Sequence, residues 1–164
     1  MFKIAQKNDL PAIVAIYNQA IKTRQSTADL QAVTVAERRT WFYQHNVQQR
    51  PLWIICWSNQ TVGWLSLSDF NPRAAYRHTT EVSLYLDNNY QGKHLGTAAL
   101  QFMEKQLPQY DIQTVVALIF SHNQASQRLF QNFGYQNWGH LPQVAELDGL
   151  KRDLDYLGRK YLSK

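Results

Sequence analysis

Apolar residues along the first quarter of the chain recur at the spacing of helices. After Asp9 they stand three or four positions apart, which predicts a helix with Asp9 as its N-cap and one face in the core: Ile13, Ile16, Tyr17, Ala20 and Ile21. The letters TVAE at positions 34–37 have the form of a capping box, in which each end of the motif satisfies a free backbone N–H. They predict the start of a second helix.

Three segments in the middle of the chain have the pattern of strands. Residues 52–57 and 62–70 are apolar runs, and the four polar residues 58–61 between them predict a hairpin loop. Residues 79–86 alternate strictly, so that one face of this strand is apolar and the other carries Glu81, Ser83 and Tyr85. The two faces of this strand therefore meet different surroundings.

The second half of the chain alternates between the helical and the strand-like patterns of apolar residues. Helical spacing predicts a helix over residues 95–107, and the continuous apolar run at 115–120 predicts a strand covered on both faces. Asn123 can cap a further helix that Gly134 closes in a left-handed conformation. Short strands are expected near 135–140 and 153–157. This order of elements predicts an α/β (α+β) fold with a mixed sheet and helices on its faces.

Composition limits the classes of protein that fit. The length of 164 residues suits one domain, residues 1–164. A single cysteine excludes an intramolecular disulfide, and the absence of a signal-like start or an apolar run of about 20 residues predicts a cytoplasmic protein without a membrane span. The net charge of +5 suits an anionic partner, either nucleic acid or a phosphorylated cofactor. Most aromatic residues lie within apolar runs, which argues against nucleic acid.

The segment QGKHLG at positions 91–96 lies between a predicted strand and a predicted helix. Such a junction offers unpaired backbone N–H groups and the positive end of a helix dipole, which suit a pyrophosphate. Gly92 and Gly96 permit close approach of the backbone, and Lys93 and His94 add basic side chains. A plain tight turn is the alternative. The spacing fits neither the dinucleotide fingerprint GxGxxG nor the P-loop GxxxxGK.

The loop and the segments around it resemble the GNAT acyltransferases. The loop after the strand EVSLYL is similar to the (Q/R)xxGx(G/A) loop of that family, and NPRAAYRHTTEVSLYL and SHNQASQRLFQNFGY resemble its phosphinothricin and methionine sulfoximine acetyltransferase branch. The resemblance covers nearly the whole chain. It implies a single-domain GNAT fold, in which a mixed, mostly antiparallel twisted sheet of about seven strands has helices on both faces and a V-shaped cofactor cleft between two splayed central strands.

The resemblance also implies an activity. The family transfers an acetyl group from acetyl-CoA directly to a primary amine, here the amine of a small amino-acid-like acceptor, and uses no metal. Glu81 matches the general base of the branch. Cofactor-binding positions carry over to the following residues: Leu84, Tyr85, Leu86, Gln91, Gly92, Lys93, His94, Leu95, Gly96, Asn123 and Ser126. Related enzymes are often homodimers, which we expect here too.

The segment before Glu81 matches the acceptor-binding segment of the branch: Arg73, Ala74, Ala75, Tyr76 and Arg77. An arginine suits a carboxylate because its planar fork donates two parallel hydrogen bonds. The expected acceptor therefore carries a free carboxylate, as phosphinothricin and methionine sulfoximine do. A purely structural ion pair between Glu81 and Arg73 or Arg77 is the competing interpretation of these residues.

Three departures from the branch concern chemistry. His94 stands where the loop usually has glycine, Phe130 stands where many members have a tyrosine that protonates the leaving thiolate, and Lys151 stands near the place of a tryptophan. The missing tyrosine leaves open an acyl-CoA-binding regulator without turnover, and a peptide or protein amine is a further alternative acceptor. The five histidines have no close ligand spacing, so no metal site is predicted.

Overall fold

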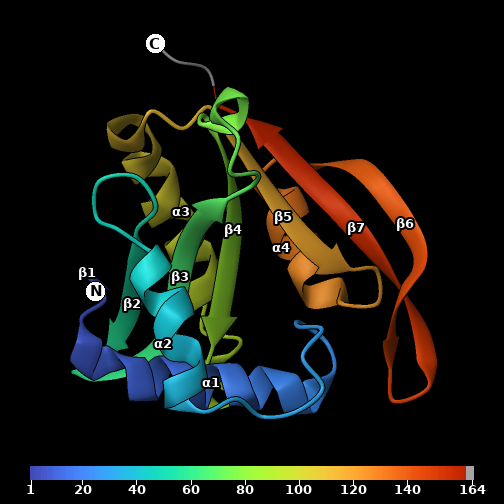
Figure 1. Cartoon of the computed structure of the whole chain (residues 1–164), viewed down its shortest axis with the longest axis horizontal. Helices are drawn as coiled ribbons and strands as arrows, with labels where there is room; N and C mark the ends of the chain where they lie inside the picture. Colours follow the sequence, from blue (N-terminus) through green and yellow to red (C-terminus); the bar gives the residue numbers. More distant parts are fainter. Residues whose placement is uncertain (162–164) are drawn as a thin grey trace.

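A computed structural model describes residues 1–161, in which a seven-stranded sheet has the order β1-β2-β3-β4-β5-β7-β6 (Figure 1). All neighbouring strands in this sheet are antiparallel except β4 and β5, which are parallel. The strands are β1 (Phe2–Ile4), β2 (Leu52–Trp57), β3 (Gln60–Asp69), β4 (Thr79–Leu86), β5 (Thr114–Phe120), β6 (Gln136–Leu147) and β7 (Leu150–Lys160). The predicted mixed, mostly antiparallel sheet is therefore confirmed.

Within residues 1–161, four α-helices cover the two faces of the sheet (Figure 1). On one face lie α1 (Leu10–Thr23) and α2 (Val35–Gln44), whose apolar side chains pack with those of β2 and β3. On the other face lie α3 (Leu95–Gln106) and α4 (Gln124–Asn132), which enclose the larger core cluster with β4, β5 and β7. Short 3₁₀ turns occupy Lys7–Asp9, Ala74–Tyr76, Asn88–Tyr90 and Leu107–Tyr110.

The strands β4 and β5 separate soon after they begin. Their pairing covers only three residues of each strand, with Glu81 opposite Val116 as the last pair. Beyond that point β4 stays paired with β3 up to Leu86, and β5 stays paired with β7 up to Phe120. A V-shaped gap therefore opens in the middle of the sheet, as Figure 1 shows between the two labelled strands.

Local signals in the sequence had mixed outcomes at the helix ends. The capping box is present, because the Glu37 N–H donates to Thr34 Oγ1 at 3.2 Å and the Thr34 N–H donates to Glu37 Oε2 at 2.7 Å. Gly134 has φ of 78° and its N–H donates to the Gln131 carbonyl after α4, as predicted. Asp9 occupies the N-cap position of α1, as predicted, but its carboxylate does not cap the helix and accepts instead from the Gln6 N–H at 2.7 Å, in the 3₁₀ turn before α1.

The hairpin of β2 and β3 has a tighter turn than predicted, and the hairpin of β6 and β7 has longer strands. Only Ser58 and Asn59 lie between β2 and β3, both with positive φ, so the four-residue loop expected at 58–61 is wrong. The short strands expected at 135–140 and 153–157 are a long hairpin, in which β6 and β7 are joined by Asp148 and Gly149 with positive φ. Left-handed residues at both loop positions match the twist of the flanking strands, which favours such two-residue turns.

Candidate active site

Two adjoining cavities follow the gap between β4 and β5. One, of about 430 Å³, is lined by Glu81, and we call it the Glu81 cavity. The other, of about 640 Å³, lies at the start of α3, and we call it the α3 cavity. The two share five lining residues: Ser26, Leu84, Tyr85, Asn123 and Ser126. They therefore form one continuous cleft from Glu81 to the segment QGKHLG.

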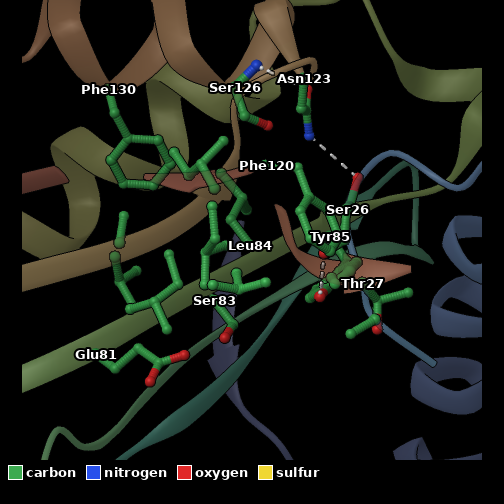
Figure 2. A pocket seen from close by; sticks show the side chains of 18 residues that line it. Ser26, Thr27, Glu81, Ser83, Leu84, Tyr85, Phe120, Asn123, Ser126 and Phe130 are labelled. Carbon is green, nitrogen blue, oxygen red and sulfur yellow. Dashed lines mark hydrogen bonds between the residues drawn. The ribbon is translucent and has the colours of Figure 1, made fainter. Parts of the chain in front are cut away.

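Glu81 lies half-buried at one end of this cleft, with Ser83 next to it on the same face of β4 (Figure 2). Within residues 1–161 its carboxylate has no hydrogen bond and no ion pair, and burial raises its pKa above the ordinary range of a glutamate. Arg77, a suggested structural partner, donates instead to His78 Nε2 at 2.8 Å. A desolvated and unpaired carboxylate at a cleft has the properties of a general base for a protonated amine.

The backbone of β4 presents unpaired groups to the gap. The His78 carbonyl accepts from Gln113 and Thr114 on the β5 side, whereas the Asp87 N–H donates to Val62 on the β3 side. Because successive residues of a strand direct their backbone groups to opposite neighbours, even-numbered residues of β4 face β5. Leu84 and Leu86 lie beyond the last β4–β5 pair, so their N–H and C=O groups face the cleft. Those of Tyr85 face β3.

The start of α3 borders the far end of the cleft. The first backbone N–H with a partner four residues earlier belongs to Ala98 and donates to His94, so the N–H groups of the first turn, residues 95–97, are free for a ligand. Gly92 has φ of 74°, and a Cβ added there would meet no atom within 4 Å. This is the form of an anion-binding loop. His94 borders the cavity, whereas the Lys93 ammonium lies over the Tyr90 ring, 4.5 Å from its centroid.

His94 itself has a left-handed backbone, with φ of 59° and ψ of 15°, at the N-cap of α3. Glycine adopts this backbone conformation at the lowest free-energy cost of any residue. The His94 side chain accepts no hydrogen bond from the helix that would offset the cost. Histidine at this position therefore carries local backbone strain.

Asn123 and Ser126 border both cavities at the start of α4 (Figure 2). Asn123 caps the helix, because its Oδ1 accepts from the Ser126 N–H at 3.1 Å. Its Nδ2 donates to the Gln25 carbonyl at 3.1 Å and to Ser26 Oγ at 3.4 Å. Asn123 thus also holds the segment between α1 and α2 against the cleft.

The predicted acceptor-binding segment lies outside both cavities. All five of its residues are exposed, and none lines either cavity: Arg73, Ala74, Ala75, Tyr76 and Arg77. Arg73, Ala74 and Arg77 line a separate hollow of about 430 Å³ beside Arg50 and Asp69. The structure therefore brings Glu81 together in one cleft with the predicted cofactor-binding residues other than Lys93, but not with these arginines.

Phe130 lines the Glu81 cavity (Figure 2). Its ring is buried and makes an edge contact with the Tyr135 ring at a centroid distance of 5.0 Å. It has no hydroxyl to donate a proton.

Some residues of the cleft were not identified from the sequence. Ser26 and Thr27 precede α2, and Val144 and Ala145 lie on β6, yet all four line the Glu81 cavity. Their positions depend on contacts between distant segments, such as the Tyr85 hydroxyl donating to the Ser26 carbonyl at 2.9 Å. No local pattern marks them.

The cleft fits an elongated ligand that carries a phosphate group. Free N–H groups at α3 suit the phosphates, and unpaired backbone groups of Leu84 and Leu86 suit an amide-containing arm running beside β4. Within residues 1–161, no three His, Cys, Asp or Glu side chains lie together in a way that could hold a metal ion. No helix in that same range is long and apolar enough to cross a membrane. Fold and cleft together define an acyl-transfer enzyme that binds its donor between two splayed strands.

Comparison with known proteins agrees with this class. The family model described as acetyltransferase (GNAT) family matches residues 14–135. The YwnH protein of Bacillus subtilis strain 168, described as a candidate phosphinothricin acetyltransferase, is 41% identical over 96% of this chain and 97% of its own. An L-methionine sulfoximine/L-methionine sulfone acetyltransferase of Pseudomonas paraeruginosa is 31% identical over 91% of this chain and 87% of its own.

A solved structure extends the likeness to three dimensions. The yncA acetyltransferase candidate of Salmonella typhimurium, determined with its cofactor acetyl-CoA, has a TM-score of 0.92 and 26% identity, and the match covers 100% of this chain and 95% of that one. The chain belongs to the acetyltransferase (GNAT) family, and as a member it is an acetyl-CoA-dependent N-acetyltransferase. The family and enzyme class predicted from the sequence are thereby confirmed.

Proposed function

We propose that this enzyme transfers the acetyl group of acetyl-CoA to the primary amine of a small amino-acid-like acceptor of the phosphinothricin or methionine sulfoximine type, with Glu81 as general base. The observation that carries the proposal is the continuous cleft, which has an unpaired, desolvated carboxylate at one end and free helix N–H groups at the other. The names of the Bacillus and Pseudomonas relatives support the class of acceptor.

Acetyl-CoA supplies an activated thioester carbonyl. The chain's own residues have three tasks around it. The loop 91–96 and the first turn of α3 hold the pyrophosphate, and the backbone groups of Leu84 and Leu86 hold the arm. We infer that the N–H group of Leu84 or Leu86 also stabilises the negative charge that develops on the carbonyl oxygen.

Glu81 takes a proton from the acceptor ammonium, so that the free amine can attack the carbonyl carbon. A raised pKa suits this task, because it brings the carboxylate closer in basicity to the amine it deprotonates. The acceptor nitrogen loses two protons in all: the first goes to Glu81, which releases it to solvent, and the second leaves after the C–N bond has formed and balances the proton that the thiolate takes up as the C–S bond breaks. Phe130 cannot relay that second proton, so we infer that it reaches the thiolate through solvent or through Glu81 once Glu81 has released the first.

Binding of the acceptor carboxylate by Arg73 or Arg77 stays a prediction, as do the homodimer and the cytoplasmic location. We also infer that residues 1–164 form one domain, since a single sheet includes strands from both ends of the described chain. A substitution of Arg73 or Arg77 by glutamine that raises the KM for carboxylate-bearing acceptors would support their role.

The test is release of free thiol from acetyl-CoA across a panel of amino acids, phosphinothricin, methionine sulfoximine, polyamines and short peptides. The expected result is turnover with amino-acid-like acceptors and a loss of about 10²–10⁴-fold in kcat for Glu81→Gln. Glu146→Gln, which changes an exposed carboxylate on β6, is the matched control and should keep wild-type rates. Turnover only with peptides would reject the small acceptor, and undiminished Glu81→Gln turnover at all pH values would reject Glu81 as the base.

A further inference from the structure

A buried carboxylate outside the cleft joins four segments of the chain. Asp155 on β7 is 6% exposed. His140 Nδ1 lies 2.7 Å from its Oδ1, and its Oδ2 accepts from Ser121 Oγ at 2.8 Å and from Gln127 Nε2 at 2.9 Å. These side chains come from β6, from the turn after β5 and from α4. We call Asp155 and its three partners the Asp155 cluster.

Three members of the cluster directly follow a residue that lines the Glu81 cavity. Ser121 follows Phe120, Gln127 follows Ser126, and Asp155 follows Leu154. The lining residues come from β5, α4 and β7 in turn, so the cluster fixes three walls of the cavity relative to one another. It does so from the α4 side of the sheet, outside the space that a substrate would fill.

The fourth member, His140, precedes a bulge in β6. The pairing of β6 with β7 shifts between Leu141 and Ala145, and Gln143 within the bulge has φ of 52°. The bulge places Val144 and Ala145 in the wall of the Glu81 cavity. Bulges commonly serve to redirect side chains next to active sites.

Carboxylates hold this bulge at Gln143 and at His140, the residue just before it. Asp153 Oδ1 accepts from the Gln143 N–H at 2.8 Å, and Asp153 Oδ2 lies 3.4 Å from His140 Nε2. Asp155 binds the other nitrogen of the same imidazole. The His140 imidazole therefore lies between the carboxylates of Asp153 and Asp155 on β7. Because the bulge begins at the next residue, these contacts also fix the position of its start.

The charges in the cluster support this arrangement. Burial acts to raise the pKa of Asp155, but the hydrogen bonds from His140, Ser121 and Gln127 outweigh it and leave that pKa lowered. The hydrogen bond to Asp155 raises the pKa of His140 against the effect of its own desolvation. An ionised, buried Asp155 requires its donors, because an unpaired charge in that position is costly.

We propose that Asp155 is a positioning residue for the acetyl transfer: through His140 it holds the β6 bulge, and through Ser121 and Gln127 it holds the turn after β5 and the start of α4, so that the acceptor end of the cleft keeps its shape. The inference rests on the proposed function, since it assigns the Glu81 cavity to the acceptor.

The test separates the His140 arm from the rest of the fold. His140→Ala removes the imidazole, and His140→Asn keeps a donor near the position of Nδ1. We expect His140→Ala to raise the KM of the acceptor roughly tenfold, the size of one lost charge-assisted hydrogen bond, with the KM of acetyl-CoA within about twofold. His140→Asn should recover most of this loss. Glu146→Gln, in an exposed ion pair with Lys151 on the same hairpin, should change neither constant.

A second measurement does not depend on turnover. Hydrogen–deuterium exchange of the backbone amides at 141–145 should be faster in His140→Ala than in the wild type, and in Asp155→Asn the faster exchange should extend to 121–127. The double variant His140→Ala/Asp155→Asn should have an acceptor KM no higher than that of Asp155→Asn alone, because both substitutions break the hydrogen bond between His140 and Asp155.

An unchanged acceptor KM in His140→Ala, or equal losses for acceptor and acetyl-CoA, would overturn the proposal, and so would unchanged exchange in the bulge. Failure of the proposed function looks different, because the wild-type enzyme itself would then transfer acetyl groups to no amino-acid-like acceptor of the panel.

Discussion

Asn123 makes two kinds of hydrogen bond with one side chain, and substitutions can separate them. Its Oδ1 caps α4, whereas its Nδ2 tethers the segment between α1 and α2 through Gln25 and Ser26. Asn123→Ala removes both, and Asn123→Ser keeps a capping oxygen but is too short to reach the tethered segment. The side chain is buried, at 7% exposure, so water cannot easily replace the lost partners.

The magnitude follows from these contacts. Loss of an N-cap costs about 1 kcal/mol, and loss of the hydrogen bond to the Gln25 carbonyl costs about 0.5–1.5 kcal/mol more. We therefore expect Asn123→Ala to lose about 2 kcal/mol of unfolding free energy, which for a chain of this size lowers Tm by roughly 4–8 °C. Asn123→Ser should lose about half as much.

Binding should follow a different order from stability. Because the tethered Ser26 lines both cavities, losing the tether loosens a wall of the cleft in both variants. We expect the two variants to bind acetyl-CoA about equally, each roughly fivefold more weakly than the wild type, the equivalent of about 1 kcal/mol. Urea unfolding gives the stabilities, and titration calorimetry gives the affinities.

Two results would refute this reasoning. Equal stability of Asn123→Ala and Asn123→Ser would show that the helix cap contributes nothing. Wild-type affinity in Asn123→Ser together with weakened affinity in Asn123→Ala would show that the cap, and not the tether, shapes the cleft.

Three further predictions concern single residues. Burial raises the pKa of Glu81, so kcat/KM should rise with pH above the ordinary pKa range of a glutamate. The free energy of unfolding should fall as pH rises from the pKa of Glu81 in the unfolded chain to its higher pKa in the folded chain. Glu81→Gln should abolish both effects, and a rise of kcat/KM with pH that survives in this variant would assign it to another group. His94→Gly relieves a left-handed backbone and should add up to about 1 kcal/mol of stability without weakening acetyl-CoA binding, whereas a large loss in calorimetry would show that the imidazole contacts the ligand. Gly158→Ala places a Cβ 1.9 Å from Trp138 Cε3 and should cost about 1–3 kcal/mol in urea unfolding, while Gly139→Ala, whose Cβ would lie 3.8 Å from Tyr156 Cβ, should cost much less.

Local patterns predicted most of the elements because each pattern corresponds to a local physical requirement. The alternation in residues 79–86 reflects a strand between two different layers, and the capping box at 34–37 satisfies backbone donors within one turn. The long β6–β7 hairpin was predicted as two short strands because much of its surface is exposed, so apolar residues do not alternate clearly along it.

The candidate site was predictable to the extent that its residues lie in one contiguous motif. The loop 91–96 shows its chemistry locally, since glycines and a helix start follow one another in sequence. The cleft-lining residues of the α1–α2 segment and of the β6 bulge have no such signal. Arg73 and Arg77 were expected to bind the acceptor because residues 73–77 match the acceptor-binding segment of the branch, yet the segment with the 3₁₀ turn at Ala74–Tyr76 lies beside Arg50 and Asp69.

The sequence by itself determined the order of helices and strands, the family and the positions of Glu81, the loop 91–96 and Asn123. Only the tertiary structure decided where the sheet opens, because strand separation depends on the twist of β4 with β3 and of β5 with β7 rather than on any one segment. It also decided which side chains meet around Asp155, whose partners lie 15, 28 and 34 residues away. Contacts at such separations form only when the chain has folded, and no local spacing encodes them.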